Sequence, residues 1–559
     1  MKRWLILGFA VFLSASLFAN DAKLAPELKP NTGSQMVSVI VQYKTPPGDV
    51  HRARIQALAG TVGKELRVVN ALTAQLPANA VAALSDDDSV AYISPDRPMR
   101  SHMNNAALAV NANYAWGLGL DGTGIGVAVI DSGIHNVDDL QNASGQSRVV
   151  YSQDFMGGNG DDGYGHGTHV AGIIGGNATD STCTSCTAAI RGMAPNVSLI
   201  NLRALDQNGQ GSDSTVIAAI DAAIALQNVY NIRVINLSVG RPVWESYTLD
   251  PVCQAVEQAW QAGMVVVVSA GNDGRDDSLG TDGYFTIEAP GNDPYVMTVG
   301  ATNTMGTPQR SDDVMTSYSS KGPTPIDYIV KPDLVAPGNR IVSLQEPGTL
   351  VQGYPQNRPW NSYYMTVGTF ARPSSSYFIL SGTSMSTGVV SGAAALMLQQ
   401  DPTLTPDQVK ARMMKTAWKG LPQYSTIDDG STSTTYIVQS DGFTVGAGYL
   451  DVQAALSNTD RAVGLAKSPT ATYDPTSGEV FFLADTTSAW WQSATWAPSL
   501  VWGSNIFLSG NSAMWGSSAM WGNSAMWGNS AMWGNSAMWG NSAMWGNSTM
   551  WGNLLITGD

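Results

Sequence analysis

Cysteine and charge are both scarce in this sequence. Its 559 residues include three cysteines, and only 13% of them are charged. The formal net charge of −15 argues against nucleic acid or an anionic membrane as a partner, because like charges repel. Cys183 and Cys186 could close a small disulfide loop, which leaves Cys253 as a small buried apolar side chain. A zinc site at this pair would need a second pair of ligands, which the sequence does not supply.

Long apolar runs are absent outside the amino-terminal end. Residues 4–18 are mostly apolar, follow Lys2 and Arg3, and precede Ala19. This is the pattern of a secretory signal peptide rather than of a transmembrane anchor. No later segment is apolar for long enough to span a bilayer. We therefore expect residues 1–19 to be a signal peptide and the protein to be secreted or held at the cell envelope.

The carboxyl-terminal part lacks charge altogether. No charged residue lies between Thr486 and Gly558, and residues 511–552 are seven hexapeptides of the type Asn-Ser-Ala-Met-Trp-Gly. An even period in an extended chain places every tryptophan on one face, whereas a helix would scatter them. We expect a linker at 457–510 and then a repetitive, β-type tail, with an unstructured spacer as the alternative. Such an apolar face is expected to bind the envelope, a polysaccharide or the tail itself.

Three short segments carry the residue types of nucleophilic catalysis. An apolar strand is expected at 125–131 and ends at Asp131, while His166 and Ser384 each begin a helix of small residues. Active sites gather at the carboxyl ends of parallel strands and at helix N-termini. A serine needs a base to take its proton and a third group to orient that base. Taken alone, Ser384 could be an ordinary helix cap.

The order Asp, His, Ser along the chain is the order found in subtilisin. Three motifs match the subtilases, the subtilisin-like serine proteases, residue by residue: Val-Ile-Asp-Ser-Gly at 129–133, His-Gly-Thr-His-Val-Ala-Gly at 166–172 and Gly-Thr-Ser-Met at 382–385. The chain resembles this family from about Tyr114 to Leu456.

The resemblance implies a catalytic domain at 114–456. Its fold class would be α/β, with a doubly wound, mostly parallel sheet, and strands and helices do alternate along this part of the sequence. The implied activity is that of a serine endopeptidase that hydrolyses protein or peptide substrates through an acyl-enzyme intermediate. Asp131 would orient and stabilise His166, His166 would act as base and then acid, and Ser384 would attack the scissile carbonyl.

Further site residues follow from the same resemblance. Asn272, after an apolar strand at 264–269, would help to hold the oxyanion, although a turn asparagine is the plain alternative. Two segments would pair with an extended substrate as an added strand, and both could also be simple turns. Their residues are Gly211, Ser238, Val239 and Gly240. No acidic residue obviously lines the expected specificity pocket, so we expect a broad preference for apolar or uncharged side chains.

Some features depart from the family pattern. Gly388 lies inside the expected helix after Ser384, where it costs about 1 kcal/mol relative to alanine. No cofactor is required for the implied chemistry. A structural calcium ion rests on analogy alone, with Asp138 and Asp139 as possible ligands and no clear motif. We expect His135 to be a surface residue and His169 to be structural.

A separate small domain is expected at 36–100. Its pattern predicts an α+β unit, with strands at 37–43, 71–76 and 90–96 and helices at 51–66 and 78–84. It resembles the propeptide that precedes subtilase catalytic domains. The resemblance implies an intramolecular inhibitor that is cleaved between Pro98 and Asn113. A permanent accessory domain is the alternative.

Two other functions compete with that of a protease. One is a catalytically inactive subtilase scaffold used for binding, and the other is a surface or adhesive protein whose essential part is the tryptophan-rich tail. The complete set of Asp131, His166, Ser384 and Asn272 counts against the inactive scaffold. Labelling with a fluorophosphonate would separate both from an active enzyme.

Overall fold

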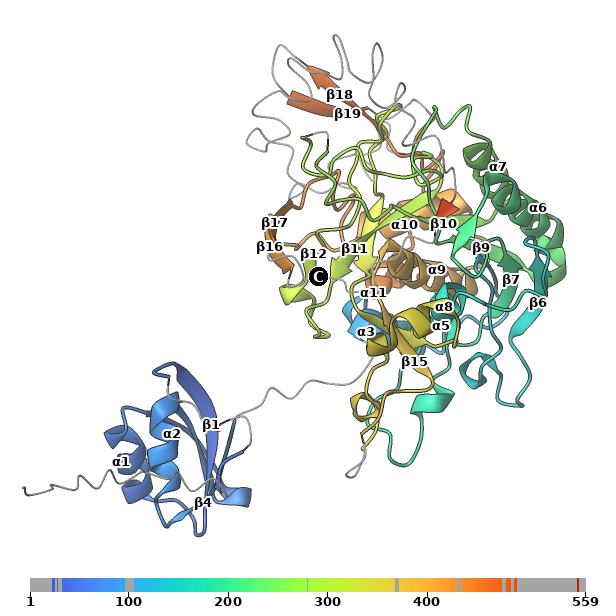
Figure 1. Ribbon diagram of the computed structural model, residues 1–559. Coiled ribbons are helices and arrows are strands. Elements are labelled where there is room, and N and C mark those ends of the chain that lie inside the picture. Colours follow the sequence, from blue (N-terminus) through green and yellow to red (C-terminus); the bar gives the residue numbers. More distant parts are fainter. Residues whose placement is uncertain are drawn as a thin grey trace, which may run out of the picture. The chain divides into compact units, whose positions relative to one another are not determined.

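The computed structural model describes most of the chain (Figure 1). The described residues are 23–25, 28, 33–95, 105–278, 280–366, 371–429, 434–474, 479–483, 487–489 and 550–551. The expected signal peptide and most of the hexapeptide tail lie outside them. The chain divides into two compact units, residues 1–100 and 101–559. Within the described part, no helix has both the length and the apolar character needed to cross a membrane.

The first unit is a four-stranded antiparallel sheet with two helices. Its strand order is β2-β3-β1-β4. The elements are β1 (Met36–Tyr43), α1 (Asp49–Ala57), β2 (Thr61–Leu66), β3 (Ala71–Pro77), α2 (Ala78–Ser85) and β4 (Val90–Pro95). The alternating residues Val39 and Val41 of the central strand β1 are fully buried, as are Leu72 and Leu76 of β3. This α+β unit has its own apolar core.

The predicted bounds of one helix in this unit were partly wrong. We expected a helix over 51–66, but α1 ends at Ala57 and the later residues form β2. Ala59 has a positive φ of 58°, which stops the helix. Gly60 then lies against Leu76, where a Cβ atom would come within 2.4 Å of that side chain. The chain is thereby turned onto the sheet, where β2 pairs with β3.

The second unit is built on an eight-stranded sheet. Its order is β12-β11-β10-β9-β5-β7-β6, with β13 paired to β11. The strands are β5 (Gly126–Asp131), β6 (Val149–Asp154), β7 (Ser198–Arg203), β9 (Ile232–Leu237), β10 (Val265–Ser269), β11 (Met297–Asn303), β12 (Val314–Met315) and β13 (Leu334–Pro337). Neighbours are parallel except for β11 and β12.

Helices cover both faces of this sheet. The long ones are α5 (His166–Gly175), α6 (Asp213–Tyr230), α7 (Pro251–Gln261), α9 (Thr383–Gln400) and α10 (Pro406–Thr416). Helices α5 and α9 pack together, and so do α6 and α7. Every residue of β5 is buried, as a parallel strand between two helical layers requires. The expected α/β fold with a doubly wound, mostly parallel sheet is confirmed.

Shorter elements complete the unit. They are α3 (Asn105–Ala109), α4 (Ala112–Gly117), β8 (Gln210–Gly211), β14 (Ile341–Leu344), α8 (Thr349–Gly353), β15 (Tyr377–Leu380), β16 (Tyr424–Asp429), β17 (Thr434–Gln439), α11 (Val452–Ser457), β18 (Thr470–Asp474), β19 (Glu479–Leu483) and β20 (Met550–Trp551).

The expected linker at 457–510 differs from what the structure describes there. Strands β18 and β19 form an antiparallel hairpin. Ala466 and Val480 join a second apolar cluster that also contains Phe443 of the catalytic region. The Ser468 hydroxyl donates a hydrogen bond to the buried Asp333 carboxylate at 2.5 Å. The first part of this segment is therefore packed onto the catalytic unit, because it carries enough apolar residues to bury.

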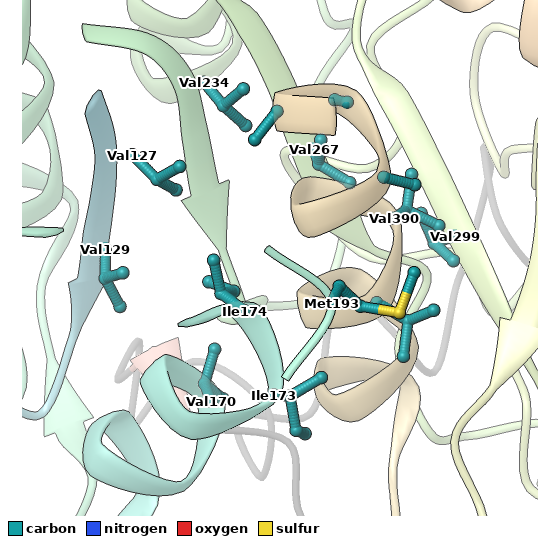
Figure 2. Close-up of a cluster of buried hydrophobic side chains, with 14 of the residues drawn as sticks. Val127, Val129, Val170, Ile173, Ile174, Met193, Val234, Val267, Val299 and Val390 are labelled. Atoms are coloured by element: carbon teal, nitrogen blue, oxygen red, sulfur yellow. The ribbon is translucent and has the colours of Figure 1, made fainter. Parts of the chain in front are cut away.

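An apolar layer between the sheet and two helices sets the position of the functional segments. Figure 2 shows this layer, whose labelled residues are Val127, Val129, Val170, Ile173, Ile174, Met193, Val234, Val267, Val299 and Val390. All of these side chains are buried. The layer fixes α5 and α9 against β5, β9 and β10. The carboxyl ends of these parallel strands share one edge, so Asp131 and the segments after β9 and β10 lie at the same edge.

Candidate active site

Asp131 and His166 form a buried pair. Asp131 is the last residue of β5, and His166 is the first residue of α5. His166 Nδ1 lies 2.7 Å from Asp131 Oδ1. The backbone N–H of Ser132 donates to the same oxygen, also at 2.7 Å. The exposed fractions of both side chains are at most 1%, so the ring orientation is fixed by the carboxylate.

The pKa of His166 is raised above its ordinary value. Burial by itself disfavours the imidazolium, but the charge of Asp131 and the hydrogen bond to it outweigh that effect. The charge of the buried Asp162 carboxylate raises the pKa of His166 further. The pair is therefore suited to hold a proton on the imidazole after it has been taken from another group.

The Asp162 carboxylate accepts hydrogen bonds from residues at the start of α5. This residue was not identified from the sequence. Its Oδ1 accepts hydrogen bonds from the Ser132 hydroxyl at 2.8 Å and from Gly165 N–H at 2.7 Å. Its Oδ2 accepts from Thr168 N–H at 2.8 Å. Burial raises the pKa of Asp162. A signal was available, because an acidic residue shortly before a helix is a usual partner of its free N–H groups.

Ser384 lies in the first turn of α9, next to the end of β9. Its hydroxyl donates to the Ser238 carbonyl oxygen at 3.3 Å, and the Ser238 hydroxyl donates to the Ser384 carbonyl oxygen at 3.1 Å. His166 Nε2 is buried and has no hydrogen-bond partner among the residues that the structure describes. Since α5 and α9 pack together, this nitrogen and the Ser384 hydroxyl lie on neighbouring helices.

Asn272 follows β10 with its amide oriented by the residue before Ser384. Its Oδ1 accepts from the Thr383 backbone N–H at 3.0 Å and from the Thr383 hydroxyl at 3.2 Å. The Nδ2 group is buried without a partner in the described part of the chain. A fixed N–H donor beside a serine hydroxyl can stabilise an oxyanion that forms there.

The expected substrate residues lie on two segments near these groups. Ser238 contacts Ser384 directly, and Ser238, Val239 and Gly240 are all buried after β9. Gly211 is on β8, where a Cβ atom would lie 2.5 Å from the Ala204 carbonyl oxygen. The Ala204 N–H in turn donates to the Asp131 carbonyl oxygen at 2.8 Å. Gly211 therefore belongs to the same edge of the sheet as Asp131.

Glu288 is an acidic residue at this site that sequence reasoning did not single out. It is 6% exposed. A Cβ atom on Gly240 would lie 2.2 Å from its Oε2 atom, and one on Gly271 would lie 2.8 Å from its Cγ atom. Its carboxyl also shares a hydrogen bond with Asp273, whose pKa is raised by burial. Gly240 and Gly271 thus leave room for the carboxyl groups of Glu288 and Asp273 beside Asn272. No local sequence pattern predicts this arrangement.

Calcium does not fit the two candidate carboxylates. Asp138 is exposed. Asp139 is buried, with its oxygens accepting from Asp180 N–H at 2.7 Å and from the Tyr377 hydroxyl at 2.9 Å. Burial raises the pKa of Asp139 to about 6, and both of its carboxylate oxygens already accept hydrogen bonds from the protein. Among the described residues, no three His, Cys, Asp or Glu side chains converge on a common point.

His169, His135 and the cysteines make contacts within the protein that do not involve Ser384. His169 Nε2 lies 3.2 Å from two carbonyl oxygens, and burial with the nearby His166 lowers the pKa of His169 to about 3. His135 Nδ1 lies 2.7 Å from the partly exposed Asp161. Cys183 and Cys186 form a disulfide, while Cys253 is free and buried, as expected.

Comparison with known proteins identifies the family. Residues 122–452 match the sequence model of the subtilase family. The chain is 33% identical to serine protease AprX of Bacillus subtilis, over 67% of this chain and 81% of that protein. It is 32% identical to subtilisin E of the same organism, over 81% of this chain and 98% of that protein. An extracellular serine proteinase of Thermus sp. is 33% identical, over 74% of this chain and 94% of that protein. The chain thus belongs to the subtilase family and is a subtilisin-like serine endopeptidase.

Proposed function

We propose that this protein is a secreted endopeptidase that uses Asp131, His166 and Ser384 as its catalytic residues. The observation that carries the proposal is the buried His166 ring, with Nδ1 on Asp131 at 2.7 Å and Nε2 without a partner among the described residues. Such a ring is held in one tautomer, and its second nitrogen is ready to accept a proton. Ser384, at the start of the neighbouring helix α9, is the proposed donor.

The proposed reaction has two stages. In the first, the Ser384 hydroxyl attacks the scissile carbonyl while His166 takes its proton, and the new imidazolium is stabilised by Asp131. Asn272 Nδ2 donates to the oxyanion of the tetrahedral intermediate. His166 then gives its proton to the leaving amine, and an acyl-enzyme remains. In the second stage His166 takes a proton from a water molecule, whose oxygen attacks the acyl carbonyl carbon. The bond from that carbon to Ser384 Oγ then breaks, His166 returns the proton to Oγ, and the acyl group leaves as a carboxylic acid, which ionises in water.

The substrates we propose are extended protein or peptide segments. The segment 238–240 and strand β8 supply backbone groups at the edge of the sheet, where a peptide can add as a strand. We further propose that the unit at 36–100 is the inhibitory propeptide of a zymogen and that export depends on residues 1–19. The similarity to subtilisin E and to an extracellular serine proteinase supports export and peptide hydrolysis.

Active-site labelling tests this proposal. Wild-type protein should react with a fluorophosphonate and hydrolyse peptides, whereas Ser384→Ala should do neither, with a loss of about 10⁶ in kcat, the size known for subtilisin. Ser386→Ala is a matched control, because Ser386 is on the same helix and its buried hydroxyl donates to the Ala336 carbonyl at 2.9 Å. Labelling of the Ser384→Ala protein would show that another residue is the nucleophile. A wild-type protein without labelling would be an inactive scaffold.

A further inference from the structure

The last tryptophan repeat lies beside a strand that we assign to substrate binding. Met550 and Trp551 form β20, the short red strand in Figure 1, and belong to the seventh hexapeptide. Strand β20 pairs antiparallel with β8, with Met550 opposite Gly211 and Trp551 opposite Gln210. Among the described strands, β8 pairs with no other.

The turn before β8 leaves one backbone edge open to such a partner. The Gln210 N–H donates to Asp206 Oδ1 at 3.0 Å, and the Gln210 carbonyl accepts from Asp206 N–H at 2.8 Å. Both backbone groups of Gln210 are therefore used inside the turn. Successive residues of a strand present their backbone groups to opposite sides, so those of Gly211 face β20.

Strand β8 also lies close to the catalytic pair. Gly209, the residue before the strand, packs on the Tyr164 ring, where a Cβ atom would come within 2.5 Å. The Tyr164 ring centroid is 6.4 Å from that of His166. Gly211 packs on Ala204 and Leu205, whose N–H groups donate to the Asp131 carbonyl oxygen. A chain added along β8 thus occupies the edge that leads to His166 and Asp131.

We propose that the hexapeptide tail is an intramolecular ligand of the β8 edge and inhibits the enzyme in cis. It would bind as an added antiparallel strand in the place of a substrate. This inference rests on the proposed function of β8, and it gives the tail a partner within its own chain.

The tail is suited to this role. Strand addition uses backbone groups, so each of the seven hexapeptides offers the same ligand. A shift by six residues, an even number, presents the same face to β8. The absence of charge between Thr486 and Gly558 avoids repulsion from Asp131, Asp162 and Asp206 near this edge. A tethered segment reaches an effective concentration of about 1 mM, which is sufficient for a weak ligand to compete.

Two full-length variants test the backbone pairing. In one, the methionine of all seven hexapeptides is replaced by proline, which has no N–H to donate. In the matched control, the same residues become leucine. The positions are Met514, Met520, Met526, Met532, Met538, Met544 and Met550. For a substrate long enough to reach β8, the proline variant should show a KM about 2- to 10-fold lower than the leucine variant, for a tethered ligand with a Kd of about 0.1–1 mM. The kcat should be equal.

Two further measurements sharpen this test. A single-residue ester, too short to reach β8, should be hydrolysed equally by both variants. The synthetic hexapeptide Asn-Ser-Ala-Met-Trp-Gly should inhibit the proline variant competitively, and its analogue with proline for methionine should not. Equal KM values of the two variants for the long substrate would overturn the proposal.

Hydrogen exchange tests the binding of the tail to β8 independently of the proposed endopeptidase function. The Ser384→Ala background keeps the tail intact, and its first unit is cut off with an added protease and separated, so that an inhibitory propeptide cannot compete for β8. The Gly211 amide should then exchange more slowly in the leucine variant than in the proline variant. This readout needs no activity. Equal exchange would overturn the pairing even in an active enzyme. If no variant labels or hydrolyses, the proposed function fails, and the exchange result still decides whether the tail binds β8.

Discussion

At the scale of single residues, the site depends on carboxylates that are held away from water. Asp131 orients His166, and Asp162 holds the loop and helix start that carry it. Each oxygen of Asp162 accepts from N–H or O–H groups, so the buried charge has several donors around it. The raised pKa of His166 is a consequence of this arrangement.

The pH dependence of activity should follow His166. A protonated imidazole cannot take the Ser384 proton, so kcat/KM should fall as the pH drops through the pKa of His166, which lies above the usual value of about 6.5. Asp162→Asn removes a negative charge that favours the imidazolium, so it should move this acid limb to lower pH. The rate of fluorophosphonate labelling from about pH 5 to about pH 9, a range that includes the usual pKa of histidine, would measure the acid limb of the wild-type protein and of the variant. An unchanged midpoint would mean that Asp162 acts through structure alone.

Substrate preference should depend on Glu288. The sequence led us to expect an apolar or uncharged preference, but the Glu288 carboxyl lies beside Gly240 and Gly271, next to the proposed oxyanion donor. A lysine or arginine side chain before the scissile bond could pair with it. Glu288→Gln should lower kcat/KM for such substrates by about 10- to 100-fold, the worth of a hydrogen bond between charged groups. Matched leucine substrates serve as the control. An equal loss for both would show that Glu288 only shapes the site.

At the scale of elements, glycines set how closely α9 approaches its neighbours. A Cβ atom on Gly392 would lie 2.3 Å from Met193 Cβ, while one on Gly388 would lie 3.1 Å from Ile173 Cγ2. Gly388, which the sequence marked as a helix-weakening residue, thus lies where α9 meets α5. Close approach of α9 to α5 brings together the two helices that carry the proposed catalytic residues in their first turns.

Two alanine substitutions should differ in their effect on stability. Gly392→Ala should lower the free energy of unfolding by about 1–3 kcal/mol, because Met193 Cβ is close to its backbone and cannot move away. Gly388→Ala should change it by less than about 1 kcal/mol, since the gain in helix propensity offsets a small shift of Ile173. Urea unfolding of both variants in the Ser384→Ala background would measure this. Similar values would contradict the packing difference.

At the scale of the whole molecule, the chain holds two separate units, and residues 105–117 belong to the second. Arg310 Nε donates to the Ala109 carbonyl oxygen at 2.8 Å, and Val452 N–H donates to the Val110 carbonyl oxygen at 2.9 Å. Ala106, Ala107 and Ala109 are buried in the main core. The expected cleavage between 98 and 113 would cut packed helices over much of that range. The rest of the expected range is the segment 98–104, which lies outside the described residues.

Maturation should therefore depend on Ser384 and occur within residues 98–104. Wild-type protein should lose the first unit by self-cleavage, whereas Ser384→Ala should accumulate with that unit attached. Intact masses of the secreted proteins would show both results. Normal removal of the unit from Ser384→Ala would assign the cut to another protease, and a mature start beyond Ala109 would contradict the packing of α3.

The sequence by itself determined the family, the α/β class and the proposed catalytic residues. Parallel strands such as β10 need apolar residues on both faces, and catalytic motifs such as that around His166 are contiguous, so both can be read locally. Only the tertiary structure decided the surroundings of Asp162 and Glu288, the turn at Gly60, and the pairing of β8 with β20. Each of these depends on which distant segments meet and which charges they bury. Local periodicity carries no information on such contacts, because they arise only when the layers pack.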